Sequence, residues 1–316
     1  MQGKAMASEN DIRKLNAERI ELLIECSIQA YNALSETQIA QCAVDKVIAP
    51  AGFELIDSWS GVDSVFGREK TVETYGVVFR SRSAPWRYVF AFRGTDSALD
   101  MLDDCGVEPQ AFVPLESDAP VPDQVRVESG FNEIYTSGNG SVASMQTQLF
   151  ALIDQYQHSS QQPSEIYITG HSLGGALCQL FTLDLALSRP EISAENINFA
   201  SPRVGNEAFV EFYAAQAHHP TLRVVNVHDA VPHLPPTELG FRHHSSVYLI
   251  AFHATDILGK MDLKVAHSSD NYQAVIRCAR RSGVGGCNKA VTGCGASHDL
   301  FRVAGTGGSL SRADPI

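Results

Sequence analysis

The second half of the chain alternates between β-rich apolar runs and stretches whose apolar positions recur at helical spacing. In chain order the pattern predicts a helix at 142–157, a strand at 165–169, a helix at 174–188, a strand at 196–200, a helix at 206–216, strands at 222–228 and 246–252, and a helix at 270–280. Such alternation is typical of an α/β protein with a mostly parallel central sheet flanked by helices.

The first half is less regular. Apolar positions at helical spacing from Ile20 to Leu34 predict an N-terminal helix that lies on a core. Two β-rich runs, 75–82 and 87–95, are separated by a short Ser-Ala-Pro stretch and predict neighbouring strands joined by a tight turn. The stretch 97–128 that follows is acidic, contains four prolines and lacks strong periodicity, which is typical of a functional loop or a disordered segment.

The length of 316 residues fits one large α/β domain, which we expect to span 1–281. Residues 282–316 hold eight of the 24 glycines and almost no periodic apolar signal. We therefore expect a loosely ordered, Gly-rich C-terminal tail there.

The composition excludes general disorder and argues against nucleic-acid binding. Hydrophobic residues make up 44% of the chain, and 36 acidic against 24 basic side chains give a net charge of −12, which would repel a phosphate backbone. The longest apolar run, 247–252, is too short for a transmembrane helix or a signal peptide. We expect a soluble protein, either cytoplasmic or secreted after removal of a leader.

Candidate chemistry is concentrated in Gly170-His171-Ser172-Leu173-Gly174, a G-x-S-x-G motif between a predicted strand and a predicted helix. In that setting Ser172 lies on a sharp turn as a nucleophile, and the glycines leave room for the neighbouring strand and helix. The Leu173 N–H, at the start of the helix, is a candidate oxyanion donor. The alternative is a Gly-rich turn with an incidental serine.

A serine nucleophile needs a base and an orienting acid, which follow it in the chain in this type of site. Asp229 comes directly after a predicted strand, so its carboxylate is expected at the same sheet edge as Ser172; its alternative role is to cap a turn. Two histidines compete as the base. We favour His267, before a capped helix, over His298, which lies in the Gly-rich segment.

Several ordered motifs resemble the class 3 lipase family, which includes fungal triacylglycerol lipases and feruloyl esterases. They are the Ser172 pentapeptide, Phe92-Arg93-Gly94-Thr95, Ser129-Gly130-Phe131, Phe199-Ala200-Ser201-Pro202-Arg203-Val204-Gly205-Asn206, Asn226-Val227-His228-Asp229 and His267-Ser268-Ser269-Asp270-Asn271-Tyr272. The resemblance spans about 75–275 and implies an α/β-hydrolase fold, carboxylic-ester hydrolysis, and Thr95 as the second oxyanion donor. One departure is Glu128, where members often carry a histidine.

The family position of the lid falls on 97–104, which reads as a short amphipathic helix. The resemblance implies that this segment, with Ala98, Leu99, Met101 and Leu102, covers the site and opens at an oil–water surface. The alternative is an ordinary surface helix.

Together these patterns predict a serine hydrolase, a triacylglycerol lipase that acts at lipid–water interfaces through an acyl-enzyme. A soluble feruloyl or short-chain carboxylesterase is the alternative, and a non-catalytic lipase-like binding module is a remote one. The expected partner is a small-molecule ester or lipid. The mechanism requires no cofactor, and the histidine spacings do not match a zinc motif, so we expect no metal.

Overall fold

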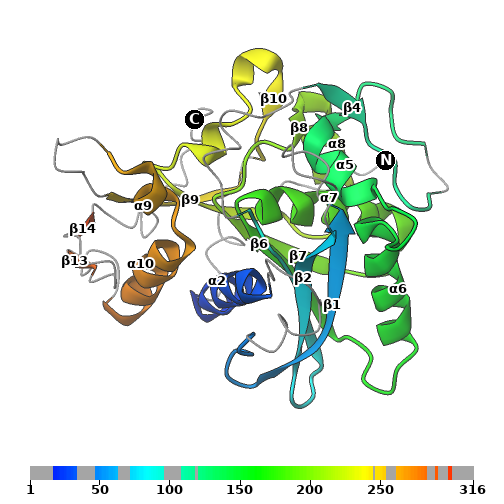
Figure 1. Cartoon of the computed structure of the whole chain (residues 1–316), viewed down its shortest axis with the longest axis horizontal. Coiled ribbons are helices and arrows are strands. Elements are labelled where there is room, and N and C mark those ends of the chain that lie inside the picture. The colour runs from blue at the N-terminus through cyan, green and yellow to red at the C-terminus, as the bar shows by residue number, and fades with distance from the viewer. Residues whose placement is uncertain are drawn as a thin grey trace.

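The computed structural model describes residues 17–33, 47–62, 72–95, 108–117, 120–244, 246–253, 261–282, 289–290 and 298–300. Within these ranges the backbone is organised around one large sheet with helices on both faces (Figure 1).

The central sheet has seven strands in the order β1-β2-β3-β6-β7-β9-β11. They span Phe53–Val62 (β1), Val72–Ser81 (β2), Arg87–Phe92 (β3), Glu165–His171 (β6), Ala194–Phe199 (β7), Leu222–Asn226 (β9) and Val247–Ile250 (β11). The first three are antiparallel, and the pairs from β3–β6 to β9–β11 are parallel. The predicted mostly parallel sheet is thus confirmed, with an antiparallel edge that includes the unpredicted β1.

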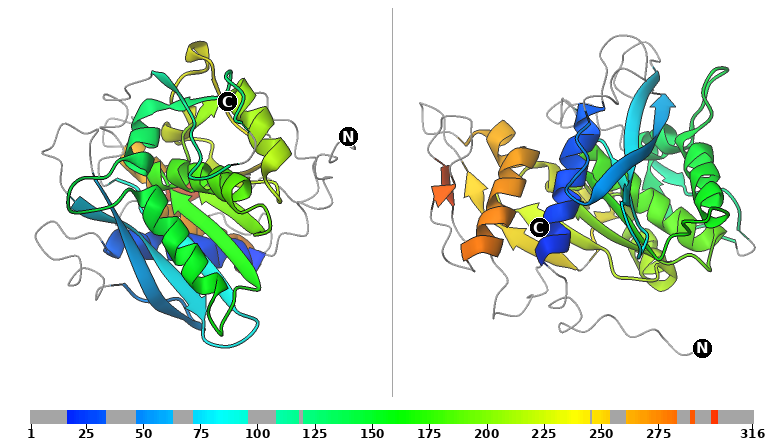
Figure 2. Two further views of the ribbon diagram at one scale, coloured as in Figure 1. Left: turned by 90° about the vertical axis from the view of Figure 1, so that its right-hand side faces the viewer. Right: turned by 90° about the horizontal axis from the view of Figure 1, so that it is seen from below.

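Helices form a layer on each side of the sheet, as the perpendicular views in Figure 2 show. The helices are Ala17–Asn32 (α2), Ser129–Thr136 (α5), Met145–Gln157 (α6), Leu173–Ser188 (α7), Glu207–Gln216 (α8), Leu263–His267 (α9) and Ser269–Ser282 (α10). One apolar cluster joins α2 and α10 to the sheet, and a second joins α5, α6, α7 and α8 to it. Each helix therefore buries its apolar stripe against a layer of strands.

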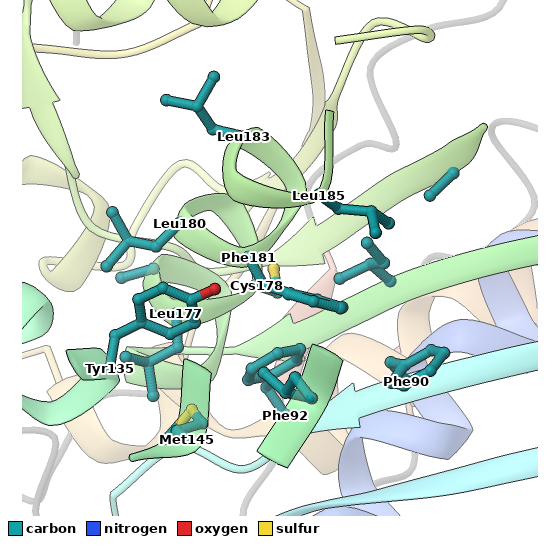
Figure 3. Close-up of a cluster of buried hydrophobic side chains, with 14 of the residues drawn as sticks. Phe90, Phe92, Tyr135, Met145, Leu177, Cys178, Leu180, Phe181, Leu183 and Leu185 are labelled. Carbon is teal, nitrogen blue, oxygen red and sulfur yellow. The ribbon is translucent and has the colours of Figure 1, made fainter. Parts of the chain in front are cut away.

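Helix α7 is buried almost along its whole length, which is consistent with its nearly continuous apolar sequence. Figure 3 shows its side chains among aromatic residues from the sheet and the neighbouring helices. The Phe181 ring centroid lies 5.6 Å from that of Phe90 and 5.8 Å from that of Phe92, both on β3. These contacts hold α7 firmly against the sheet at the point where it follows Ser172.

A buried carboxylate on α7 connects three other segments to it. Asp184 Oδ1 accepts hydrogen bonds from Leu115 N and Ser188 Oγ, each at 2.8 Å. Its Oδ2 accepts from Tyr135 Oη at 2.8 Å and Gln146 Nε2 at 2.7 Å. Burial raises the pKa of Asp184, although the four hydrogen bonds oppose this shift. The carboxylate thereby joins the 112–117 loop, α5 and α6 to the helix that begins at Ser172.

Shorter strands lie outside the main sheet. A four-stranded sheet has the order β10-β8-β5-β4, with strands Phe241–Arg242 (β10), Gly205–Asn206 (β8), Arg126–Glu128 (β5) and Pro109–Ala111 (β4). Strands β4 and β5 lie within the stretch expected to be irregular. Phe252–His253 (β12) pairs with His298–Leu300 (β14), which also pairs with Lys289–Ala290 (β13). The rest of the proposed tail lies outside the described residues, so the domain boundary at 281 stays a prediction. No helix in the described segments is long and apolar enough to span a membrane.

Candidate active site

Ser172 lies at the sharp connection between β6 and α7. Its backbone has φ 60° and ψ −129°, a conformation that residues other than glycine rarely adopt. The turn is held because Ser172 N donates to Phe199 O at 3.0 Å and Gly175 N donates to Ser172 O at 2.8 Å. The structure thus places the predicted nucleophile on a strained turn between a central strand and a buried helix.

The two glycines of the motif are required by the space around them. A Cβ added at Gly170 would lie 2.2 Å from Gly174 O, and one at Gly174 would lie 2.5 Å from Phe92 O on the neighbouring strand β3. Both distances are far below van der Waals contact with rigid backbone. The close approach of β6, α7 and β3 therefore depends on these glycines.

The structure brings His267 and Asp229 together. Asp229 follows β9, and His267 is the last residue of α9, before α10. The His267 Nδ1–H donates to both carboxylate oxygens, at 2.9 Å to Oδ1 and 2.8 Å to Oδ2. Nε2 of His267 is buried and has no hydrogen-bond partner among the described residues. This ring therefore has the carboxylate on one side and a basic nitrogen available on the other.

The other candidate base, His298, has its backbone in the short strand β14. Its side chain lies outside what the structure describes. The geometry therefore supports His267 through its bond to Asp229.

Asp229 and His267 are held in place by groups from three segments. Val231 N donates to its Oδ1 at 3.0 Å, and the Tyr272 hydroxyl, from α10, donates to its Oδ2 at 2.8 Å. Asn226, at the end of β9, donates through its side-chain amide to Ala266 O at 2.8 Å, directly before His267. The sequence motifs contain Tyr272 and Asn226, but the pattern alone assigns them no role.

A second histidine packs against the first. The His171 ring centroid lies 4.6 Å from that of His267, and Tyr272 meets His171 edge-on at 5.6 Å. Burial lowers the pKa of His171 well below its usual value, and the neighbouring His267 adds to this shift, so His171 is neutral at pH 7. Its neutral ring can therefore face a transient charge on His267 without adding a second one.

The proposed oxyanion donors lie beyond paired positions of adjacent strands. Phe92 of β3 pairs with Gly170 of β6, and Thr95 and Leu173 each follow three residues later. Gly94, directly before Thr95, is pressed against the end of β6, because an added Cβ would lie 2.7 Å from His171 O. The predicted lid residues Ala98, Leu99, Met101 and Leu102 lie outside the described residues.

Glu128, which departs from the family pattern, has a structural task. Its Oε1 accepts from Gly130 N at 3.0 Å and its Oε2 from Phe131 N at 2.7 Å, so it caps the start of α5. Burial raises the pKa of Glu128, although these two bonds oppose the shift. The carboxylate therefore satisfies the helix terminus. In the described part of the chain, His, Cys, Asp and Glu do not form a group of three able to hold a metal ion.

A nucleophile at the end of a central strand, followed in the chain by a carboxylate and a histidine on later connections, is the arrangement of α/β-hydrolases. Solved structures agree on the fold. A deletion mutant of the Rhizomucor miehei lipase in complex with its propeptide has a TM-score of 0.54 at 24% identity, covering 85% of this chain and 76% of that one. The chain has the α/β-hydrolase fold.

Sequence comparisons relate the chain to one family. The model of "Lipase (class 3)" matches residues 89–239. A Rhizomucor miehei lipase is 30% identical over 254 residues, 78% of this chain and 62% of that protein. A Gibberella zeae protein named secreted mono- and diacylglycerol lipase 2 is 35% identical over 181 residues, 51% of this chain and 43% of that protein. The chain thus spans less than two thirds of the length of these relatives, and its residues 89–239 match the class 3 lipase family.

Proposed function

We propose that the protein is a serine carboxylic-ester hydrolase, a triacylglycerol lipase that acts at lipid–water interfaces. The observation that carries this proposal is the hydrogen bond from His267 Nδ1 to both carboxylate oxygens of Asp229. Nε2 of the same ring has no hydrogen-bond partner among the described residues, and the ring packs against His171, the residue before Ser172. This is the orientation that a general base needs toward a serine nucleophile.

The reaction then follows from the roles of five residues. Ser172 Oγ attacks the ester carbonyl while His267 Nε2 takes its proton, and Asp229 holds the imidazole tautomer and stabilises the imidazolium. The Thr95 and Leu173 N–H groups donate to the oxyanion, each contributing on the order of 3 kcal/mol to the transition state. His267 returns the proton to the leaving alcohol, and a water activated by His267 hydrolyses the acyl-enzyme.

A lipid substrate is supported by the match to the class 3 lipase family, by the names of the relatives and by exposed apolar side chains. Leu239 is 50% exposed, and Met261 and Leu263, just before and at the start of α9, are 42% and 38% exposed. Leu239 follows Asp229 by ten residues, and the other two precede His267, so all three lie on connections that carry the site. We propose that these three side chains contact the lipid surface. We assign the lid role to 97–104 as part of the same proposal.

Hydrolysis of tributyrin, triolein and methyl ferulate by the purified protein tests the function, with Ser172→Ala as the blank. A lipase hydrolyses both glycerides and shows a rate increase when tributyrin exceeds its solubility. Smooth saturation with preference for methyl ferulate would instead identify the soluble esterase. Absence of Ser172-dependent turnover on all three substrates would leave the non-catalytic module.

The assignment of the base and acid has its own test. His267→Ala is expected to abolish turnover and His298→Ala to retain it. Asp229→Asn is expected to lower kcat by about 10⁴-fold because the amide favours the wrong imidazole tautomer. The opposite result for the two histidines would transfer the role of base to His298.

A further inference from the structure

The N-terminal helix α2 reaches the candidate active site through one side chain, Tyr31. The Tyr31 hydroxyl hydrogen-bonds Nδ1 of His171 at 2.9 Å, and the two rings meet edge-on with centroids 5.9 Å apart. A Cβ added at Gly94 would lie 2.1 Å from the same hydroxyl. Tyr31 Oη is therefore packed directly against the Gly94 backbone.

These two contacts each lie one residue before a group in the proposed mechanism. Gly94 precedes the oxyanion donor Thr95, and His171 precedes the nucleophile Ser172. The hydroxyl joins the ends of β3 and β6, so its position affects the spacing between the Thr95 N–H and Ser172 Oγ. A misplacement of about 1 Å in such a constellation can reduce a rate by about 100-fold.

The helix that carries Tyr31 is itself held in register against β6. Ser27 Oγ donates to Leu23 O at 2.9 Å and lies 3.0 Å from Thr169 Oγ1, deep in the interface. On its other side, Arg277 of α10 pairs with Glu21 at 3.0 Å and with Glu25 at 3.3 Å. Tyr31, one turn beyond Ser27, is therefore presented from a fixed helix.

Tyr31 also acts on the proposed base through His171. Because its hydroxyl holds Nδ1, it limits rotation of the His171 ring, which packs at 4.6 Å against the His267 ring. The same hydroxyl thus restrains neighbours of the nucleophile, the oxyanion donor and the base.

We propose that Tyr31 is a positioning residue for the ester hydrolysis proposed above, on which this inference rests. Its hydroxyl sets the spacing of Thr95 and Ser172 and the orientation of His171 beneath His267. Through this contact the N-terminal helix α2 is part of the active site, in addition to its packing against the sheet.

Tyr31→Phe tests the proposal because it removes only the hydroxyl. Activity is measured on soluble p-nitrophenyl butyrate and divided by the number of reactive serines, titrated with a p-nitrophenyl phosphonate that releases one p-nitrophenol per nucleophile. We expect kcat per titrated site to fall about 10- to 100-fold, with KM changed less than about twofold. A merely structural role would lower the number of titrated sites and leave kcat per site at the wild-type value, which would overturn the proposal.

Tyr213→Phe is the matched control. Tyr213 is also buried, and its hydroxyl lies 2.6 Å from Thr221 Oγ1, a residue with no part in the proposed mechanism, so kcat per site should equal that of the wild type. Should Tyr31→Phe fail to accumulate, Gly94→Ala displaces the same hydroxyl and also presses on His171 O, and it is expected to lower kcat per site; an unchanged value would again overturn the proposal. Wild-type protein without Ser172-dependent turnover would overturn the proposed function, whereas active wild type with an equally active Tyr31→Phe overturns this inference alone.

Discussion

The Tyr272 hydroxyl donates to Oδ2 of Asp229 at 2.8 Å, the same oxygen that His267 Nδ1 approaches at 2.8 Å. Tyr272 Oη also accepts a hydrogen bond from Asn226 N at 2.8 Å. One buried hydroxyl thus connects the last residue of β9, the proposed acid and helix α10. Because Asp229 is almost fully buried, its orientation depends on such neighbours rather than on water.

Tyr272→Phe should therefore impair both stability and catalysis. Removing the hydroxyl leaves a buried carboxylate oxygen with one donor fewer and Asn226 N without this acceptor. We expect the free energy of unfolding to fall by about 2 kcal/mol and kcat/KM by about tenfold. Urea unfolding and p-nitrophenyl butyrate kinetics measure these effects. Tyr88→Phe, which removes a buried bond to Gln161 O, should lower stability alone; equal kcat/KM losses in both variants would refute a specific effect on Asp229.

Gly174→Ala should be among the most damaging small substitutions in the chain. Its Cβ would lie 2.5 Å from Phe92 O and 2.8 Å from Arg93 C, so β3 and α7 must separate. We expect a loss of about 3 kcal/mol in the free energy of unfolding and of nearly all turnover. Gly140→Ala is the control, because a Cβ there meets no described atom within 4 Å. Thermal unfolding of the two variants gives the comparison, and near-equal melting temperatures would contradict the expectation.

Asp184→Ala should destabilise the fold without acting on the chemistry directly. The substitution leaves the donors of Leu115, Tyr135, Gln146 and Ser188 without this acceptor, at a cost on the order of 3 kcal/mol. Asp154 forms an ion pair with Arg189 at 2.9 Å but is 46% exposed, so Asp154→Ala should cost less than about 1 kcal/mol. The urea midpoints of unfolding of the two variants at pH 7 test this difference. Similar midpoints would show that Asp184 does not stabilise the contacts between α7 and the segments it joins.

Acid should destabilise the protein through its buried histidines. Burial lowers the pKa of His244 to about 3, and burial lowers that of His243 well below its usual value, with Arg223 adding to both shifts. Because the folded pKa lies below the unfolded value of about 6.5, the unfolded chain binds more protons, and stability is lost as the pH falls below about 6.5.

His244→Gln isolates one of these contributions. Between pH 6 and 4 the slope of unfolding free energy against pH should decrease by up to about 1.4 kcal/mol per pH unit, since one proton is no longer taken up on unfolding. His219→Gln, on the surface, is the control for the loss of a histidine. Urea titrations at several pH values provide the slopes; an unaltered slope in His244→Gln would exclude the buried ring as a source of acid sensitivity.

Elements with strong local patterns could be predicted from sequence, and their ends deviate for identifiable reasons. The helix predicted from 142 begins at Met145 because the Ser144 side chain accepts from Thr147 N and caps it. The strand predicted to reach 228 ends at Asn226, whose side chain accepts from Phe252 N at 3.0 Å. The edge strand β1 was not predicted because half of its residues are only half-buried, which weakens the apolar alternation.

In the candidate site, too, residues with a local sequence motif could be predicted and residues joined by long-range contacts could not. Ser172 is marked by its own pentapeptide, whereas the contact of Tyr31 with His171 joins residues 140 positions apart. Neither residue type carries a signal for that partner, because a tyrosine on a helix face reads as core packing. Asp184 likewise reads as one charge in an apolar helix, since its four donors come from distant segments and from its own last turn. Long-range polar contacts of this kind become visible only when the fold is known.

Strand β6 is fourth of the seven in the central sheet, with three strands on either side. Fraying that starts at an outer strand must therefore pass two others before it reaches β6, which leads directly into Ser172. Amide protons of β6 should then exchange with solvent only when the whole sheet opens. Loss of activity on heating should accordingly coincide with global unfolding. Variants selected for a higher melting temperature should therefore also keep the Ser172 hydroxyl in its active position to a higher temperature.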